Sequence, residues 1–198
     1  MPQTPHPTLY TIGHSTHPTE EFVRLLRMHD ITAVCDVRSA PYSRYNPQFN
    51  RETLVASLQE ASITYVYLGG ELGARVQDPA CWEAGRVSYA KVAQADFFLA
   101  GLERVREGMR GYRVTLMCAE KDPLTCHRMM LVTRNLRGED IAIRHIRADG
   151  SLETNVEAER RLLEAARLPR GTLFQGEAEM VEEAYERVGR KMAGMVKV

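Results

Sequence analysis

The stretch VTLMCAEKDPLTCHR, from Val114 to Arg128, is the part of the chain on which the interpretation of the fold depends. Its apolar start predicts a buried strand that carries Cys118 and Glu120 to its C-terminal end. Asp122-Pro123 predicts a helix start, because aspartate is a good N-cap and proline is tolerated at the first helical position. Unpaired N–H groups at a helix N-terminus favour anions. A thiol, a carboxylate and an anion-binding helix end are therefore expected at one turn.

Strands alternate with helices on both sides of this turn. The predicted strands are 8–13, 31–37, 63–68, 112–119 and 141–146. The predicted helices are 18–29, 52–61, 124–136, 155–168 and 177–193, and the region 89–110 is expected to form one long helix or two broken ones. This alternation predicts an α/β fold with a mostly parallel sheet of about five strands, helices on both faces and additional C-terminal helices. With Asp122 as the N-cap and Pro123 as the first helical residue, Cys126 is expected at the fourth helical position, with His127 and Arg128 directly after it.

The domain organisation follows from the same pattern. We expect residues 8–168 to form a single α/β domain, since the alternation is continuous there. Pro169-Arg170-Gly171 interrupts the helical pattern. We expect residues 169–198 to form a helical extension packed on the domain.

The composition argues against a membrane-spanning protein and against a global attraction to nucleic acid. The chain has 198 residues, of which 44% are hydrophobic and 26% are charged, and its formal net charge is zero. We find no apolar stretch long enough to span a bilayer, and Met1–Pro7 lacks the features of a signal peptide. The four cysteines lie on or near predicted buried elements. We therefore expect reduced thiols and a cytoplasmic protein.

Polar or glycine residues follow every predicted strand, in the segments 14–16, 36–39, 69–71, 118–120 and 145–147. Ligands of parallel α/β sheets bind outside the carboxyl ends of the strands. Since these ends meet at one edge of the sheet, we expect the five segments to line a common site.

Five residues of this edge are candidates for catalysis. His14, Asp36, Glu120 and His127 could transfer protons, and Cys118 could act as a thiolate nucleophile activated by the helix N-terminus. Each also has a structural interpretation. A cysteine in this position is commonly a small buried hydrophobe, a histidine can cap a helix, and an aspartate can bind neighbouring loop N–H groups.

Binding of an anionic substrate is expected from arginines, serines and glycines of the same edge. Arginine binds phosphate or carboxylate through its planar fork, and glycine allows close backbone approach or positive φ. Alternatively, Arg38 pairs with Asp36 or Glu120 and braces the loops. The candidate substrate-binding residues are Ser15, Arg38, Ser39, Ser43, Arg44, Gly69, Gly70 and Arg128.

The segment 41–51, PYSRYNPQFNR, interleaves aromatic residues with arginines. Such a loop can stack on bases and contact phosphates. It can also pack its own aromatic side chains over the edge of the sheet. Both interpretations are open at this point.

No cofactor is assigned, because the glycine spacing matches neither a Walker loop nor a dinucleotide fingerprint. No metal ligand is assigned either. Cys118, Cys126, His127 and His14 could bind zinc, but the separation of the two cysteines is wide for a zinc knuckle and the sequence has no C-x-x-C pair. A metal site at Cys118, Cys126 and His127 is therefore the less favoured alternative.

Five motifs in order resemble those of the bacterial and archaeal family catalogued as domain of unknown function 488. They are TIGHS, DVR-x-x-P-x-S, LGGELG, CAEKDP-x-x-CHR and HI-x-x-DG, which run from about Leu9 to Gly150. The tail FQGEAEMVEEAYERV is similar to the C-terminal helix of that family, while Ala74 departs from it where a further glycine is expected. The resemblance implies an α/β domain with a site at this edge, and it implies no reaction.

The leading hypothesis from sequence is an enzyme, a hydrolase or group transferase, that acts on a phosphate-bearing substrate such as a nucleotide or nucleic acid component. The alternatives are a non-catalytic nucleotide or nucleic-acid sensor and a metal-binding protein. A small phosphate-bearing ligand is the expected partner, and a membrane is not. The C-terminal helix carries Met180, Val188 and Met192 at apolar spacing, which suits either the core or a homodimer contact.

Overall fold

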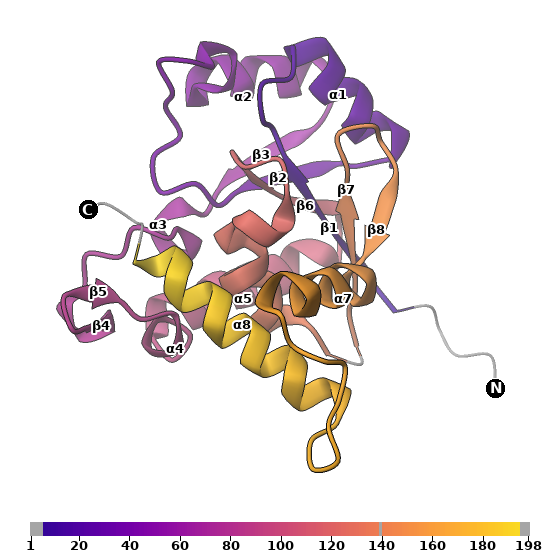
Figure 1. The fold of residues 1–198 in the computed structure, drawn as a ribbon. Helices are drawn as coiled ribbons and strands as arrows, with labels where there is room; N and C mark the ends of the chain where they lie inside the picture. Colours follow the sequence, from indigo (N-terminus) through magenta and orange to yellow (C-terminus); the bar gives the residue numbers. More distant parts are fainter. Residues whose placement is uncertain (1–5, 139, 195–198) are drawn as a thin grey trace.

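The computed structural model of the chain describes residues 6–138 and 140–194. Within these residues a six-stranded sheet has the order β3-β2-β6-β1-β7-β8 (Figure 1). Its strands are β1 (Thr8–Gly13), β2 (Ala33–Asp36), β3 (Thr64–Tyr67), β6 (Val114–Cys118), β7 (Ala142–Ile146) and β8 (Leu152–Thr154).

The sheet is parallel apart from its last strand. β6 lies between β2 and β1, with Ala33 opposite Val114 and Gly13 opposite Cys118. All five residues of β6 are buried, as expected for an apolar strand that is covered on both faces. β8 pairs antiparallel with β7 at the edge. The predicted α/β fold with a mostly parallel sheet is thus confirmed.

Helices cover both faces of the sheet (Figure 1). On one face α1 (Thr19–Met28) and α2 (Arg51–Glu60) bury Phe22, Leu25 and Leu54 in one apolar cluster. On the other face a larger cluster joins β6 to the remaining long helices. Those helices are α5 (Asp96–Met109), α7 (Asn155–Ala166) and α8 (Glu177–Ala193).

The helix α8 packs against α7 and belongs to this larger cluster. Tyr185 of α8 is fully buried, and its hydroxyl donates to Glu159 Oε1 of α7 at 3.1 Å. Met180 is buried in the same cluster, while Val188 and Met192 pack against it partly exposed. In the part of the chain that the structure describes, no helix has the length and apolar character needed to cross a membrane.

The region from 82 to 110 settles one open prediction and adds strands that the sequence did not predict. Of the two alternatives for 89–110, the structure has the broken one, with the helices α4 (Tyr89–Val92) and α5, because Ala95 is extended between them. Residues 82–87 form a small hairpin of β4 (Trp82–Glu83) and β5 (Arg86–Val87), and β8 was likewise not predicted. The remaining short elements are α3 (Gly69–Leu72), α6 (Arg134–Leu136) and the 3₁₀ turns η1 (Pro47–Phe49), η2 (Pro79–Cys81) and η3 (Pro123–Thr125).

The predicted helix 124–136 is wrong at its N-terminal half. Asp122 does cap a turn, and its carboxylate accepts from Leu124 N–H at 3.0 Å, but that turn is the 3₁₀ turn η3. Cys126 is extended, with φ −134° and ψ 139°, and so does not take the fourth helical position. A π-helix, η4 (Arg128–Thr133), then leads into α6. A π-helical turn of this kind is frequently found at functional sites.

The connections reverse direction between β1 and β6. The chain leaves β1 through α1, on one face of the sheet, and leaves β6 through η4, on the other. The helical segments that follow these adjacent parallel strands therefore lie on opposite faces of the sheet. Ligands of open α/β sheets bind at such a point, outside the carboxyl ends of the strands.

Candidate functional site

The loops after β1 and β6 remain in contact beyond the ends of the strands. The N–H of His14 donates to the Cys118 carbonyl and that of Ser15 to the Ala119 carbonyl, each at 2.9 Å. Close approach requires glycine at position 13, because a Cβ atom there would overlap the carbonyl group of Glu120. The two loops are therefore one rigid unit at the carboxyl edge.

Four side chains of the Cys118–His127 segment converge in this unit. Cys118 Sγ and Cys126 Sγ each lie 3.0 Å from Glu120 Oε2. His127 Nδ1 lies 3.7 Å from the Cys118 sulfur and 4.0 Å from the Cys126 sulfur. We call Cys118, Glu120, Cys126 and His127 the thiol cluster. Glu120 is its exposed member, and the other three are buried.

The orientation of His127 is determined by its second nitrogen. Nε2 lies 2.9 Å from the carbonyl oxygen of Val37, in the loop after β2. A carbonyl oxygen only accepts, so we assign the ring proton to Nε2. The lone pair of Nδ1 in the neutral ring therefore points at the two sulfur atoms.

The cluster favours ionisation of one of its two thiols. Burial opposes the charge on Cys126, but the neighbouring Cys118, the Arg128 guanidinium and His127 hold its pKa well below that of an ordinary thiol. The same neighbour, Cys126, together with burial raises the pKa of Cys118. Burial raises the pKa of Glu120, and although burial opposes the charge on His127, Cys126 raises its pKa above the usual value. The cluster can thus hold a thiolate beside a proton donor, or bind a cation.

Arg128 supports the cluster from inside the protein. Its side chain is 0% exposed, and it donates to the carbonyl oxygens of Glu120 at 2.6 Å and Lys121 at 3.1 Å. Its backbone N–H lies 3.4 Å from Cys126 Sγ. The Arg128 guanidinium group thus holds the loop after β6, which carries Glu120 and Cys126, in place.

Asp36, Arg38 and His14 form a second buried group beside the cluster. Arg38 binds the Asp36 carboxylate with two nitrogens, at 2.9 and 2.6 Å, and donates to the Phe49 carbonyl at 3.0 Å. Of the two interpretations offered above, the structure thus contains the ion pair with Asp36. Tyr65 donates to the same carboxylate at 2.9 Å.

His14 is neutral in this group. Burial, with Arg38 as the second cause, lowers its pKa to about 4. Nδ1 lies 2.9 Å from the Ser15 carbonyl and therefore carries the proton, so Nε2 accepts from Arg38 at 3.2 Å. The ring stacks on Phe49, which joins the 41–51 segment to the end of β1.

The loops after β2 and β3 complete the edge. Ser39 Oγ accepts from the Arg75 N–H at 2.9 Å, and Tyr67 donates to the Ser39 carbonyl at 3.1 Å. A Cβ atom on Gly69 would overlap the Arg38 carbonyl oxygen, whereas one on Gly70 would meet open space. The close-approach interpretation therefore applies to Gly69, and neither glycine has positive φ.

The remaining predicted substrate-binding residues lie on the outer loop. Ser43 Oγ caps the turn by accepting from the N–H groups of Tyr45 and Asn46. Arg44 is exposed and stacks on Tyr45, with its Cζ 5.1 Å from the ring centroid. The side-chain hydrogen bonds of Ser43 and Arg44 are made within the outer loop and not with the thiol cluster.

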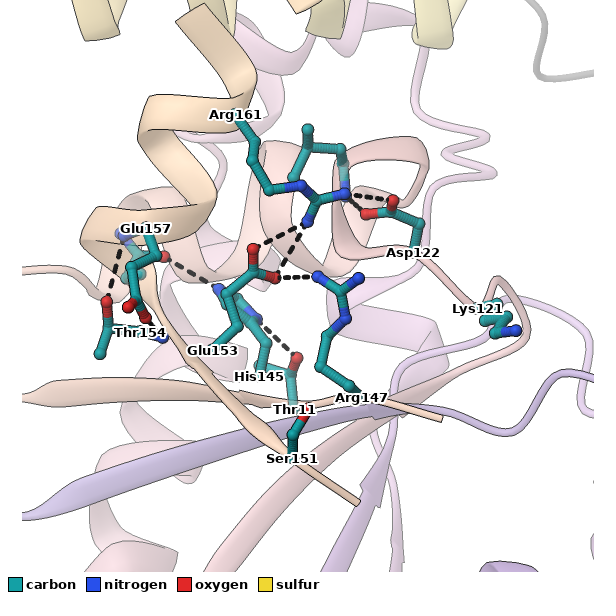
Figure 2. A network of polar contacts seen from close by, with 12 residues as sticks. Thr11, Lys121, Asp122, His145, Arg147, Ser151, Glu153, Thr154, Glu157 and Arg161 are labelled. Atoms are coloured by element: carbon teal, nitrogen blue, oxygen red, sulfur yellow. Dashed lines mark hydrogen bonds and ion pairs between the residues drawn. The ribbon is translucent and has the colours of Figure 1, made fainter. Parts of the chain in front are cut away.

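The loop after β7 joins the site through charged side chains (Figure 2). Arg161 of α7 pairs with Asp122 and with Glu153 of β8, and Glu153 also pairs with Arg147 at 2.8 Å. His145 lies below them, within 2.9 Å of Thr11 Oγ1 on β1. His145 therefore connects β7 to the neighbouring strand β1 and to Asn155 of α7.

Several residues at the site have a role that the sequence does not predict. The sequence predicts Cys126 only as a possible zinc ligand, whereas in the structure its sulfur lies 3.0 Å from Glu120 Oε2. Tyr89 has a buried hydroxyl with no hydrogen-bond partner among the described residues, and no sequence signal marks it. Exposed cations that the sequence interpretation did not select are Arg51, Arg75 and Lys121.

Comparison with known families identifies the chain. The family model described as domain of unknown function DUF488 matches residues 18–134. The chain belongs to the DUF488 family. The matched residues include the whole thiol cluster and Arg38, whereas Gly13, His14 and the end of β7 lie outside them. No curated protein and no solved structure matches the chain. The description of the DUF488 family assigns no reaction, so a function has to be argued from the geometry.

Proposed function

We propose that the carboxyl edge of the sheet is the active site of a hydrolase or group transferase that acts on a phosphate-bearing substrate. The observation that carries this proposal is the thiol cluster at the carboxyl ends of the neighbouring strands β1 and β6. A thiol with lowered pKa, an imidazole and a carboxylate within hydrogen-bonding reach are the groups that nucleophilic and acid–base catalysis requires.

The charge around the cluster supports an anionic substrate. Arg51, Arg75 and Lys121 are exposed and form no ion pair among the described residues. Arg51 and Arg75 belong to the segments after β2 and β3, which the contacts of Ser39 and Tyr67 join. Lys121 belongs to the segment after β6, which the contact between His127 and the Val37 carbonyl joins to the loop after β2. In this proposal, Arg38 and Arg128 position the loops, and the exposed cations meet the ligand.

The test is a panel of phosphate esters and nucleoside or nucleotide glycosides incubated with the purified full chain. For any substrate consumed, we expect Cys126→Ser and Glu120→Gln to lower kcat by at least about 100-fold, the usual contribution of acid–base groups. Cys81→Ser, at a buried cysteine outside the cluster, is the matched control. Equal turnover in the wild type and both cluster variants would contradict the proposal.

A second candidate is a nucleotide or nucleic-acid sensor, because the outer loop exposes aromatic side chains. Tyr42 is 57% and Tyr45 81% exposed, and Arg44 stacks on the latter. Aromatic and arginine side chains in this arrangement can stack on bases. If calorimetry detects nucleotide or single-stranded nucleic acid binding that Tyr45→Ala weakens, and no substrate is consumed, the sensor function replaces the enzymatic one.

A further inference from the structure

The thiol cluster has the donor set of a transition-metal centre. Two sulfurs, one imidazole nitrogen and one carboxylate oxygen lie within 4.8 Å of one another. Zinc sites have ligands at about 2.0–2.3 Å in a tetrahedron, which puts the ligand atoms roughly 3.3–3.8 Å apart. The sulfur–oxygen separations of 3.0 Å and sulfur–nitrogen separations of 3.7 and 4.0 Å are close to these values.

The surroundings of the cluster also suit a bound metal. A metal-binding histidine usually donates its other N–H to a carbonyl or carboxylate, and His127 Nε2 has that contact with Val37. The Arg128 N–H is directed at Cys126 Sγ, a contact that stabilises a thiolate ligand. These contacts orient two of the four ligands from outside the cluster.

Two polar groups next to the cluster point independently to a charged ligand there. The buried Tyr89 hydroxyl has no hydrogen-bond partner among the described residues, and Tyr89 belongs to the same buried cluster as Cys118 and Cys126. Arg128 is fully buried, and within the described chain it forms no ion pair with a carboxylate. Buried charges in proteins are normally paired or bound to metals.

We propose that Cys118, Glu120, Cys126 and His127 bind one zinc ion. With two thiolates and one carboxylate, the centre would carry a net charge of −1, opposite to that of the buried Arg128. Glu120 is the exposed ligand and the one that solvent or substrate can displace. This inference rests on the proposed active site and specifies how it acts: the four side chains would hold a Lewis acid that can bind a phosphate oxygen, in place of acting themselves as nucleophile and acid–base groups.

The ligand loop is held independently of any metal. Arg128 binds two carbonyl groups of the loop, Asp122 caps η3, and Arg161 pairs with Asp122. Such support lowers the conformational cost of binding an ion. Removal of the metal is therefore expected to leave the fold intact, so that metal-free protein can be reloaded.

The experiment measures metal content and metal binding in the full chain. We expect elemental analysis of freshly purified protein to find zinc at about one ion per chain. After chelation, we expect Co²⁺ to produce a sulfur-to-cobalt charge-transfer band that stoichiometric Zn²⁺ abolishes. Cys126→Ser should lose that band, and Glu120→Gln should weaken zinc binding by at least about tenfold.

The matched control is Cys81→Ser, which removes a buried thiol outside the cluster and should bind zinc as the wild type does. Circular dichroism of each variant shows whether it is folded, and Glu120→Gln changes only the exposed ligand. Iron in place of zinc, the absence of a charge-transfer band, or wild-type zinc affinity in both cluster variants would overturn the inference. Zinc binding without turnover of any substrate would leave the metal site standing and remove the proposed enzyme. Unchanged turnover in the metal-free protein would leave the proposed enzyme standing and remove the Lewis-acid role of the metal.

Discussion

Gly13 shows how one residue controls the geometry of the site. It ends β1 opposite Cys118, and the Glu120 carbonyl group occupies the space that a side chain would need. The obstacle is backbone, which cannot move aside as a flexible side chain can. The position of Glu120, and with it the thiol cluster, therefore depends on the absence of a Cβ atom at position 13.

We predict that Gly13→Ala lowers the free energy of unfolding by about 1–3 kcal/mol, the usual cost of overpacking. The matched control is Gly70→Ala, since a Cβ atom there meets open space. This control is expected to leave stability unchanged or to raise it by up to about 1 kcal/mol, because alanine restricts the unfolded chain. Urea denaturation of both variants measures the difference, and equal stabilities would show that the two loops can separate freely.

At the scale of elements, the turn between β6 and η4 is built from three short pieces in place of one helix. The 3₁₀ turn η3, the extended Cys126 and the π-helix η4 follow one another. Because the backbone of Cys126 is extended, its sulfur points toward Glu120. Helical φ and ψ angles at this residue would point the side chain in a different direction. The thiol cluster thus depends on the irregular backbone of this turn.

Asp122 stabilises this turn in two separable ways. Its carboxylate accepts from the Leu124 N–H and pairs with Arg161, and although burial opposes the charge, these groups lower its pKa. We predict that Asp122→Ala lowers the free energy of unfolding by about 1–2 kcal/mol through loss of the cap. Asp122→Asn keeps a capping oxygen and loses only a partly exposed ion pair, which is worth less than about 1 kcal/mol. Thermal denaturation of the two variants side by side tests this, and equal losses would contradict a capping role.

At the scale of the whole molecule, two buried neutral histidines make the fold sensitive to acid. His14 lies at the end of β1, and His145 lies on the neighbouring strand β7. His145 Nε2 lies 3.2 Å from Asn155 Oδ1, and Nδ1 lies 2.9 Å from the Thr11 hydroxyl. Burial is the largest cause that lowers the pKa of each ring from 6.5 to about 4. The folded protein thus takes up these protons less readily than the unfolded chain.

Because both pKa values are lower in the folded state, their contribution to stability is complete above the unfolded value of 6.5 and is lost as the pH falls toward 4. We predict that the free energy of unfolding falls across this window by on the order of 3 kcal/mol for each histidine. In His145→Gln the fall should be reduced to about half, while His6→Gln, at an exposed residue, should retain it in full. Denaturation at a series of pH values measures this dependence, and a flat profile between pH 6.5 and 4 would contradict it.

Much of the architecture could be predicted from the sequence because its signals are local. The apolar runs identify the five parallel strands, and the periodic apolar positions identify α1, α2, α7 and α8. The short hairpin β4–β5 and the edge strand β8 have no such run, since two or three residues are too few to show a period. The helix predicted over 124–136 failed because its cap signal, Asp122-Pro123, is equally compatible with a 3₁₀ turn.

The sequence by itself determined which residues reach the carboxyl edge, because a parallel sheet sends every strand end to the same side. Only the tertiary structure decided which partner each of these side chains contacts and how exposed it is. In the folded chain Arg38 pairs with Asp36, Arg128 is buried against carbonyl groups, and Arg44 is exposed. It also brought the Cys126 sulfur to Glu120, across six residues of chain. Burial and pairing depend on contacts between distant segments, and spacing along a single chain does not encode them.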